Sequence, residues 1–186
     1  MRKLIYWVHT SLDGFIDGPN GAFDWPVFDK EMQAYAYEVH DDVDTFLYGR
    51  TVWDMMSAYW PTADENTDEE HALRFAPIWR STPKVVFSTT LEKADWDTTV
   101  VGGDIAAAVR ELKAAPGRDL LLNGGAHVAT ELGRHGLIDD YQVFVHPLML
   151  GGGTPLFPGG GDRLNLRLTG SRVLDGQVVL TRYVPR

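Results

Sequence analysis

The sequence predicts an α/β chain with a β-rich C-terminal end. Up to residue 135, apolar stretches of strand length alternate with stretches of helical periodicity, which is the pattern of a sheet covered by helices. After residue 141 the pattern changes to strands alone, and an Asp-Gly turn joins the last two of them. The length of 186 residues fits one domain, so we expect a single domain over residues 1–186.

The first half of the chain is expected to form strands that alternate with helices. The loop after the opening strand is rich in Gly, Pro and Asp, and compact domains usually keep long loops of this kind for function. Met32, Tyr35, Ala36 and Val39 recur at helical spacing. The expected elements are, in order, a strand at 3–9, a loop at 11–25, a helix at 29–39, a strand at 45–48, a helix at 50–59, an acidic stretch at 61–68 and a helix at 69–80.

The second half is expected to contain two more helices and to end in strands. Asp104 is a typical N-cap, Pro116-Gly117 stops the helix that it starts, and Gly136 ends the next helix. Two glycine-rich stretches, at 151–153 and 159–161, indicate a loop between strands. The expected elements are, in order, a strand at 84–88, a helix at 104–115, a strand at 119–123, a helix at 126–135 and strands at 141–147, 164–174 and 178–184.

The composition argues against several classes of protein. A formal net charge of -9 disfavours nucleic acid, which binds basic surfaces. No apolar stretch reaches about 18 residues, so we expect no membrane span, and the N-terminal apolar run is too short for a signal peptide. The absence of cysteine removes disulfides and thiolate chemistry and indicates the cytoplasm. The histidines show no metal-binding spacing, so no metal is expected.

Two junctions between a strand and a helix carry the first functional signal. One contains Gly49 and Arg50, and the other runs from Asn123 through Gly124-Gly125 into a helix. Helix N-termini present unpaired N–H donors and partial positive charge, so they bind anions such as phosphate. Two such junctions favour a dinucleotide. The alternatives are a tight turn at the glycine pair and a solvated arginine at the helix start, although arginine there opposes the helix dipole.

Five short motifs resemble those of a known family. They are Ser-Leu-Asp-Gly-Phe-Ile-Asp-Gly at 11–18, Tyr-Gly-Arg at 48–50, Lys-Val-Val-Phe-Ser at 84–88, Asn-Gly-Gly at 123–125 and Pro-Leu-Met-Leu-Gly-Gly-Gly-Thr-Pro-Leu-Phe at 147–157. In this order they resemble the dihydrofolate reductase-like superfamily, in the branch of the reductase domain of the bifunctional riboflavin biosynthesis deaminase/reductase. The resemblance implies a central mixed, mostly parallel sheet flanked by helices, with NADPH across the carboxyl ends of its strands. It also implies a homodimer formed through the C-terminal strands.

The same resemblance implies which residues hold NADPH. Arg50 would pair with the adenosine 2′-phosphate, helped by Ser88 and its neighbours, and this favours NADPH over NADH. The glycine pair would let the pyrophosphate approach the backbone. The alternative for residues 88–90 is that they only end the strand and take no part in binding. The expected cofactor-binding residues are Thr10, Ile16, Gly49, Arg50, Thr51, Ser88, Thr89, Thr90, Asn123, Gly124, Gly125, Ala126 and His127.

A reduction also needs a proton. The candidate catalytic residues are Asp24, Asp29 and His9, because relatives place a carboxylate after the loop and histidine titrates near neutral pH. Glu31, His127 and water remain alternatives. Asp13 is the other carboxylate in reach, and we expect it to hold the loop by hydrogen bonds to nearby backbone.

The sequence departs from the riboflavin branch in three ways. Trp7 stands where that branch has lysine, Asn123 stands where it has glutamate, and its substrate-phosphate motif has no counterpart between Tyr59 and Pro83. The expected function is therefore an NADPH-dependent reductase of a small heterocyclic or carbonyl substrate, pterin-like or pyrimidine-like. The alternatives are an NADPH-binding protein without turnover and a phosphate-ligand binding module.

Overall fold

The centre of the fold is a single mixed β-sheet. The computed structural model describes residues 1–159 and 163–186, and within them the strands form one eight-stranded sheet in the order β4-β3-β2-β5-β1-β6-β8-β7. All neighbouring strands are parallel except where β8 pairs with β6 and β7. The α/β class and the mostly parallel sheet expected from the sequence are confirmed.

The bounds of most elements differ little from those expected. The structured elements are, in chain order, β1 (Leu4–Ser11), η1 (Pro19–Gly21), α1 (Lys30–Asp41), β2 (Val43–Gly49), α2 (Arg50–Tyr59), η2 (Trp60–Glu65), α3 (Glu70–Ser81), β3 (Lys84–Phe87), β4 (Thr98–Val101), α4 (Ile105–Ala114), β5 (Asp119–Leu122), α5 (Ala126–Arg134), β6 (Asp140–His146), β7 (Leu166–Leu174) and β8 (Val178–Pro185). Residues 160 and 161 of the second glycine-rich stretch lie outside the described residues. Within the part that is described, no helix is both long and apolar enough to span a membrane.

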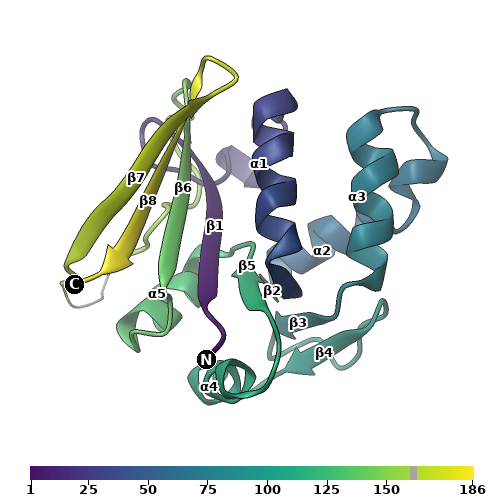
Figure 1. Ribbon diagram of the computed structural model, residues 1–186, viewed down its shortest axis with the longest axis vertical. Helices are drawn as coiled ribbons and strands as arrows, with labels where there is room; N and C mark the ends of the chain where they lie inside the picture. Colours follow the sequence, from purple (N-terminus) through teal and green to yellow (C-terminus); the bar gives the residue numbers. More distant parts are fainter. Residues whose placement is uncertain (160–162) are drawn as a thin grey trace.

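Helices cover both faces of the parallel part of the sheet (Figure 1). On one face Ile5 and Trp7 of β1 pack in a core with α1, α2 and α3. On the other face Leu4, Tyr6 and Val8 pack in a second core with α4 and α5. Because successive side chains of a strand point to opposite faces, a strand buried on both faces must be apolar throughout. This explains the unbroken apolar run at the start of the chain.

Strand β4 was not expected from the sequence. It pairs in parallel with β3, with Lys84 opposite Thr98 and Phe87 opposite Val101, at the edge of the sheet. The strand has four residues and all of them are at least partly exposed. Such a short edge strand buries too little apolar surface to leave an alternating pattern in the sequence.

The N-terminus of α1 is capped from the other end of the chain. Asp175, in the turn between β7 and β8, accepts hydrogen bonds from the backbone N–H groups of Glu31 (2.9 Å) and Met32 (3.0 Å). The Glu31 carboxylate in turn accepts a bond from the N–H of Asp175 at 2.5 Å. Asp29, at the N-cap position, makes no capping bond with its side chain. The C-terminal hairpin thereby fixes the start of α1.

Candidate functional site

The two strand-to-helix junctions lie against each other at the carboxyl ends of β2 and β5. The backbone N–H of Gly49 donates to the carbonyl of Gly124 at 3.0 Å. A Cβ atom on Gly49 would lie 3.1 Å from the nitrogen of Gly125 and 3.3 Å from Cγ2 of Val128. A glycine at residue 49 therefore lets the two junctions approach this closely without displacing a neighbouring atom.

Helices α2 and α5 both start at these junctions without a capping side chain. Their N-caps are Gly49 and Gly125, which have no side-chain acceptor to offer. By contrast, α4 is capped by Asp104, whose Oδ1 accepts from the N–H of Ala107 at 2.9 Å. Unsatisfied N–H groups at two adjacent helix starts are suited to bind an anionic group such as a pyrophosphate.

The side chains around these junctions are partly exposed and engaged in weak contacts. Arg50 Nε donates to both carboxylate oxygens of Asp54 at 2.8 Å, and both side chains are about half exposed. The Ser88 hydroxyl accepts from the N–H groups of Thr90 (3.3 Å) and Leu91 (3.0 Å) and so closes a turn after β3. The remaining predicted cofactor residues near the junctions are exposed (Thr51, Thr89, Thr90, His127), half-buried (Asn123) or buried (Ala126).

The loop after β1 is fastened to the segment after β6, and we call these two stretches, residues 11–17 and 148–156, the clasp. Asp13 accepts hydrogen bonds from the N–H groups of Leu150 (3.0 Å) and Gly151 (2.8 Å), and the bond from the Ser11 hydroxyl holds the pKa of its carboxyl below the usual value. Asp17 accepts from the N–H and the hydroxyl of Thr154 at 2.6 and 3.0 Å. Asp13 thus holds the loop through backbone N–H groups, but these belong to a segment distant in sequence and not to the nearby backbone that the sequence predicted.

Two predicted cofactor-binding residues, Thr10 and Ile16, belong to this region. Thr10 is buried, and its hydroxyl donates to the carbonyls of Ser11 and Phe15, at 3.2 Å each. Ile16 is half-buried, and its N–H donates to the carbonyl of Thr154 at 2.9 Å. The clasp therefore fixes the backbone at Ile16, and the Thr10 hydroxyl bonds to the first stretch of the clasp.

His9 lies in an aromatic cluster on the α1 side of the sheet. Its Nδ1 is 2.9 Å from Nε2 of His146, and its Nε2 accepts from the indole N–H of Trp7 at 3.0 Å. The two histidines share a face because His9 pairs with Phe144, two residues before His146. Burial and the neighbouring ring lower the pKa of His9 to about 3, and burial lowers that of His146 to about 4. His146 was not among the predicted site residues, because 137 residues separate it from its partner.

The candidate carboxylates are not part of this cluster. Asp24 and Asp29 are exposed, and Glu31 is bonded to the β7–β8 turn. Trp53 is buried in the core and stacks on Trp79 with ring centroids 5.9 Å apart. Trp25 does lie near the site, with its ring edge-on to that of His146 at 5.3 Å.

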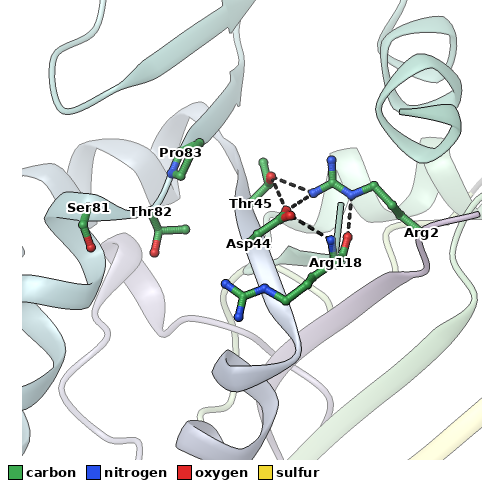
Figure 2. Close-up of a pocket in the computed structure, with 7 residues that line it drawn as sticks. All are labelled: Arg2, Asp44, Thr45, Ser81, Thr82, Pro83 and Arg118. Carbon is green, nitrogen blue, oxygen red and sulfur yellow. Dashed lines mark hydrogen bonds and ion pairs between the residues drawn. The ribbon is translucent and has the colours of Figure 1, made fainter. Parts of the chain in front are cut away.

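A separate shallow pocket, of about 360 Å³, lies at the opposite, amino edge of the sheet. Figure 2 shows Arg2 turned toward Asp44 and Thr45, with Ser81, Thr82 and Pro83 across from them. Arg2 forms an ion pair with Asp44 and donates to Thr45 Oγ1 at 2.8 Å. Since the buried cation is already paired, this group ties β1 to β2 and offers little to a ligand.

The sheet order and the paired junctions at its carboxyl edge define a dihydrofolate reductase-like α/β protein. More narrowly, the chain belongs to the RibD C-terminal domain family, whose model matches residues 2–180. The structural likeness and the family match confirm the resemblance that the five motifs indicated.

Individual relatives agree with this assignment. YyaP, an uncharacterised protein of Bacillus subtilis (strain 168), is 34% identical over 186 residues, which cover 98% of this chain and 94% of YyaP. A Shewanella sp. PV-4 protein whose name assigns it to riboflavin biosynthesis has a similar structure, with a TM-score of 0.77, 24% identity and coverage of 100% and 99% of the two chains. Dihydrofolate reductase from Enterococcus faecalis, solved in complex with NADP(H), gives a TM-score of 0.67 at 12% identity, with coverage of 99% and 96%.

Proposed function

We propose that the protein is an NADPH-dependent reductase that transfers hydride to a small heterocyclic or carbonyl substrate. The observation that carries the proposal is the contact between Gly49 and Gly124, which brings two helix starts without capping side chains to one point of the carboxyl edge. The family assignment and the NADP(H) bound by the Enterococcus faecalis relative support it.

The residues of the carboxyl edge fit an extended dinucleotide. From β3 to β1 the edge crosses three strand spacings, or about 14 Å. Along it we assign Ser88 and Arg50 to the 2′-phosphate, Gly124-Gly125 to the pyrophosphate, and Thr10 and Ile16 to the nicotinamide end. When bound there, NADPH would supply the hydride, and the clasp would hold the ring end of the site in place.

We further propose a single-domain homodimer in the cytoplasm. Strands β7 and β8 lie at the end of the sheet away from the main helices (Figure 1), and Leu168 and Val173 of β7 are 54% and 57% exposed. Exposed apolar side chains on an edge strand are suited to pairing with a second copy.

A second candidate is a protein that binds NADPH without turnover. It is favoured by the positions of the candidate proton donors. Asp24 and Asp29 are exposed, and both ring nitrogens of His9 already have partners. In the reductase candidate, the proton would therefore have to come from water.

Titration of the protein with NADPH and, separately, with NADH tests the proposal, with quenching of tryptophan fluorescence as the readout. We expect NADPH to bind more tightly than NADH, and NADPH to be consumed when a carbonyl or heterocyclic acceptor is added. Absence of binding by either nucleotide would overturn the reductase assignment. Tight binding with no consumption by any acceptor would favour the second candidate.

A further inference from the structure

The histidine pair lies between two groups that only donate hydrogen bonds. At one end the indole N–H of Trp7 points to Nε2 of His9 (3.0 Å), and at the other end the backbone N–H of Val27 points to Nδ1 of His146 (3.2 Å). Between them, Nδ1 of His9 lies 2.9 Å from Nε2 of His146. An indole nitrogen and a backbone amide have no lone pair to offer, so both outer ring nitrogens must accept.

These contacts cannot all hold with two neutral rings. Each neutral imidazole carries one N–H, and if both outer nitrogens accept, both hydrogens must lie on the inner contact. That contact between His9 and His146 has room for one hydrogen. One of the two outer contacts must therefore give way.

The contact between the Val27 N–H and Nδ1 of His146 is the one that is not a hydrogen bond. It is the longest of the three, and Val27 lies on a segment without helix or strand. Trp7, in contrast, is buried in β1 and packs against Phe144 with ring centroids 4.2 Å apart. His146 then carries its hydrogen on Nδ1, and this N–H and the N–H of Val27 point toward each other across 3.2 Å, with no acceptor for either among the described residues.

A positive charge does not resolve the excess of hydrogens. Protonation of either ring adds another donor, and burial lowers the pKa of both His9 and His146. Apart from burial, the only influence on these pKa values among the described residues is the effect of His146 on His9. The pair is therefore a neutral, donor-rich site.

The walls of this site are flat and apolar. The rings of Phe23 and Phe28 lie 6.5 and 6.1 Å from that of His9, and Trp25 packs edge-on to His146. The indole N–H of Trp25, whose ring lies edge-on to that of His146, is buried and has no hydrogen-bond partner among the described residues. A buried N–H without an acceptor costs about 1–3 kcal/mol, so an acceptor oxygen here is stabilising.

We propose that the N–H groups of His146 and Val27 form a recognition site for the carbonyl oxygen of a flat, uncharged ring of the quinone class. The proposal rests on the reductase function above and specifies its substrate. The rings of Phe23, Trp25 and Phe28, on segment 22–28, lie against the two histidines, so the ligand ring enters only when this segment shifts. The shift separates Val27 from His146, an oxygen between them then accepts both N–H groups, and the aromatic side chains cover the ring. Among the described residues no carboxylate influences the pKa of either histidine, so a cationic ring such as a protonated pterin is disfavoured.

The first test is the tautomer of His146 in the free protein. Long-range ¹H–¹⁵N NMR of the histidine-labelled chain at pH 7 should show both histidines neutral, with the hydrogen of His146 on Nδ1. A hydrogen on Nε2 of His146, or a charged ring, would overturn the proposal whatever the protein binds.

The second test uses menadione and 2-methylnaphthalene, which share a flat bicyclic ring but differ in the carbonyl oxygens. The chain has no cysteine, so the quinone cannot alkylate a thiol. Calorimetric titration should show menadione bound at least tenfold more tightly than 2-methylnaphthalene. His146→Phe should weaken menadione about tenfold, the value of one hydrogen bond, while His146→Gln, which retains a donor, should stay within about threefold of the parent.

His135→Gln, at an exposed position after α5, is the control for loss of a histidine and should leave the binding of menadione and of NADPH unchanged. Equal binding of the two probes, or unchanged menadione binding in His146→Phe, would refute the proposal. NADPH titrations of the same variants separate the two claims. NADPH binding without menadione binding removes the quinone site alone, and selective menadione binding without NADPH binding removes the reductase function alone.

Discussion

Removal of the Arg50 side chain should weaken NADPH and leave NADH unchanged. In the structure this guanidinium is paired with Asp54 four residues on, and both side chains are about half exposed. Exposed pairs of this spacing contribute about 0.3–0.5 kcal/mol, whereas charge-assisted bonds to a phosphate contribute about 1.5–3 kcal/mol. The exchange of Asp54 for the 2′-phosphate therefore favours binding by about 1–2.5 kcal/mol, and Arg50→Ala should raise the Kd for NADPH about 5-fold to 70-fold.

The assay is fluorescence titration of each variant with both nucleotides at one ionic strength, because exposed charges are screened by salt. Asp54→Asn releases Arg50 from its partner and should tighten NADPH up to about twofold. Arg74→Ala removes the same charge from α3, where the guanidinium lies over the Tyr37 ring, and should leave both affinities unchanged. If Arg50→Ala weakens NADPH and NADH by the same factor, the 2′-phosphate assignment is wrong.

Three further predictions concern stability, measured by urea unfolding. Gly153→Ala should lower the free energy of unfolding by about 2–4 kcal/mol, because its Cβ would lie 2.0 Å from the carbonyl oxygen of Asp17. Gly151 also has a positive φ but has open space around it, so Gly151→Ala should lower it by about 1 kcal/mol. Equal losses of stability in the two variants would contradict the contacts described for the clasp. Asp175→Gly should destabilise the protein by about 1–2 kcal/mol, because α1 loses the side chain that caps its N-terminus. If Asp29→Gly destabilises the protein more than Asp175→Gly does, Asp175 is not the cap of α1. Burial lowers the pKa of His9 to about 3 and those of His40, His71 and His146 to about 4. Because the unfolded chain binds these protons below about pH 6.5, stability should be complete above that pH and decline as the pH falls toward 4; constant stability from pH 7 to 4.5 would contradict the buried neutral histidines.

The sequence was sufficient for the fold class and for most of the helices and strands. Long apolar runs and helical periodicity are local signals that determine these elements. Examples are the apolar run of β1 and the buried face of α1, which includes Met32. The motif at 123–125 also predicted a glycine junction, and the structure places it against Gly49. Local signals therefore identified the parts of the proposed cofactor site.

The sequence could not predict contacts between distant segments. Asp29 is the nearest N-cap in sequence, yet Asp175 caps α1, since a hairpin 144 residues away reaches the helix start. His146 pairs with His9 only because β6 lies next to β1 in this register. Asp24 and Asp29 were predicted as catalytic because they follow the loop after β1, but both are exposed. The position of a residue after a loop does not determine which way its side chain points.

The place of β1 at the centre of the sheet has a consequence for synthesis of the chain. Its neighbours are β5 and β6, and Leu4 pairs with Leu120. On a ribosome that adds about 5–20 residues per second, β1 emerges about 5–20 s before its first partner strand. During that time an apolar, β-rich segment is unpaired, which is the condition under which nascent chains aggregate or recruit chaperones. The central strand that organises the finished sheet is therefore the segment most in need of protection while the protein is made.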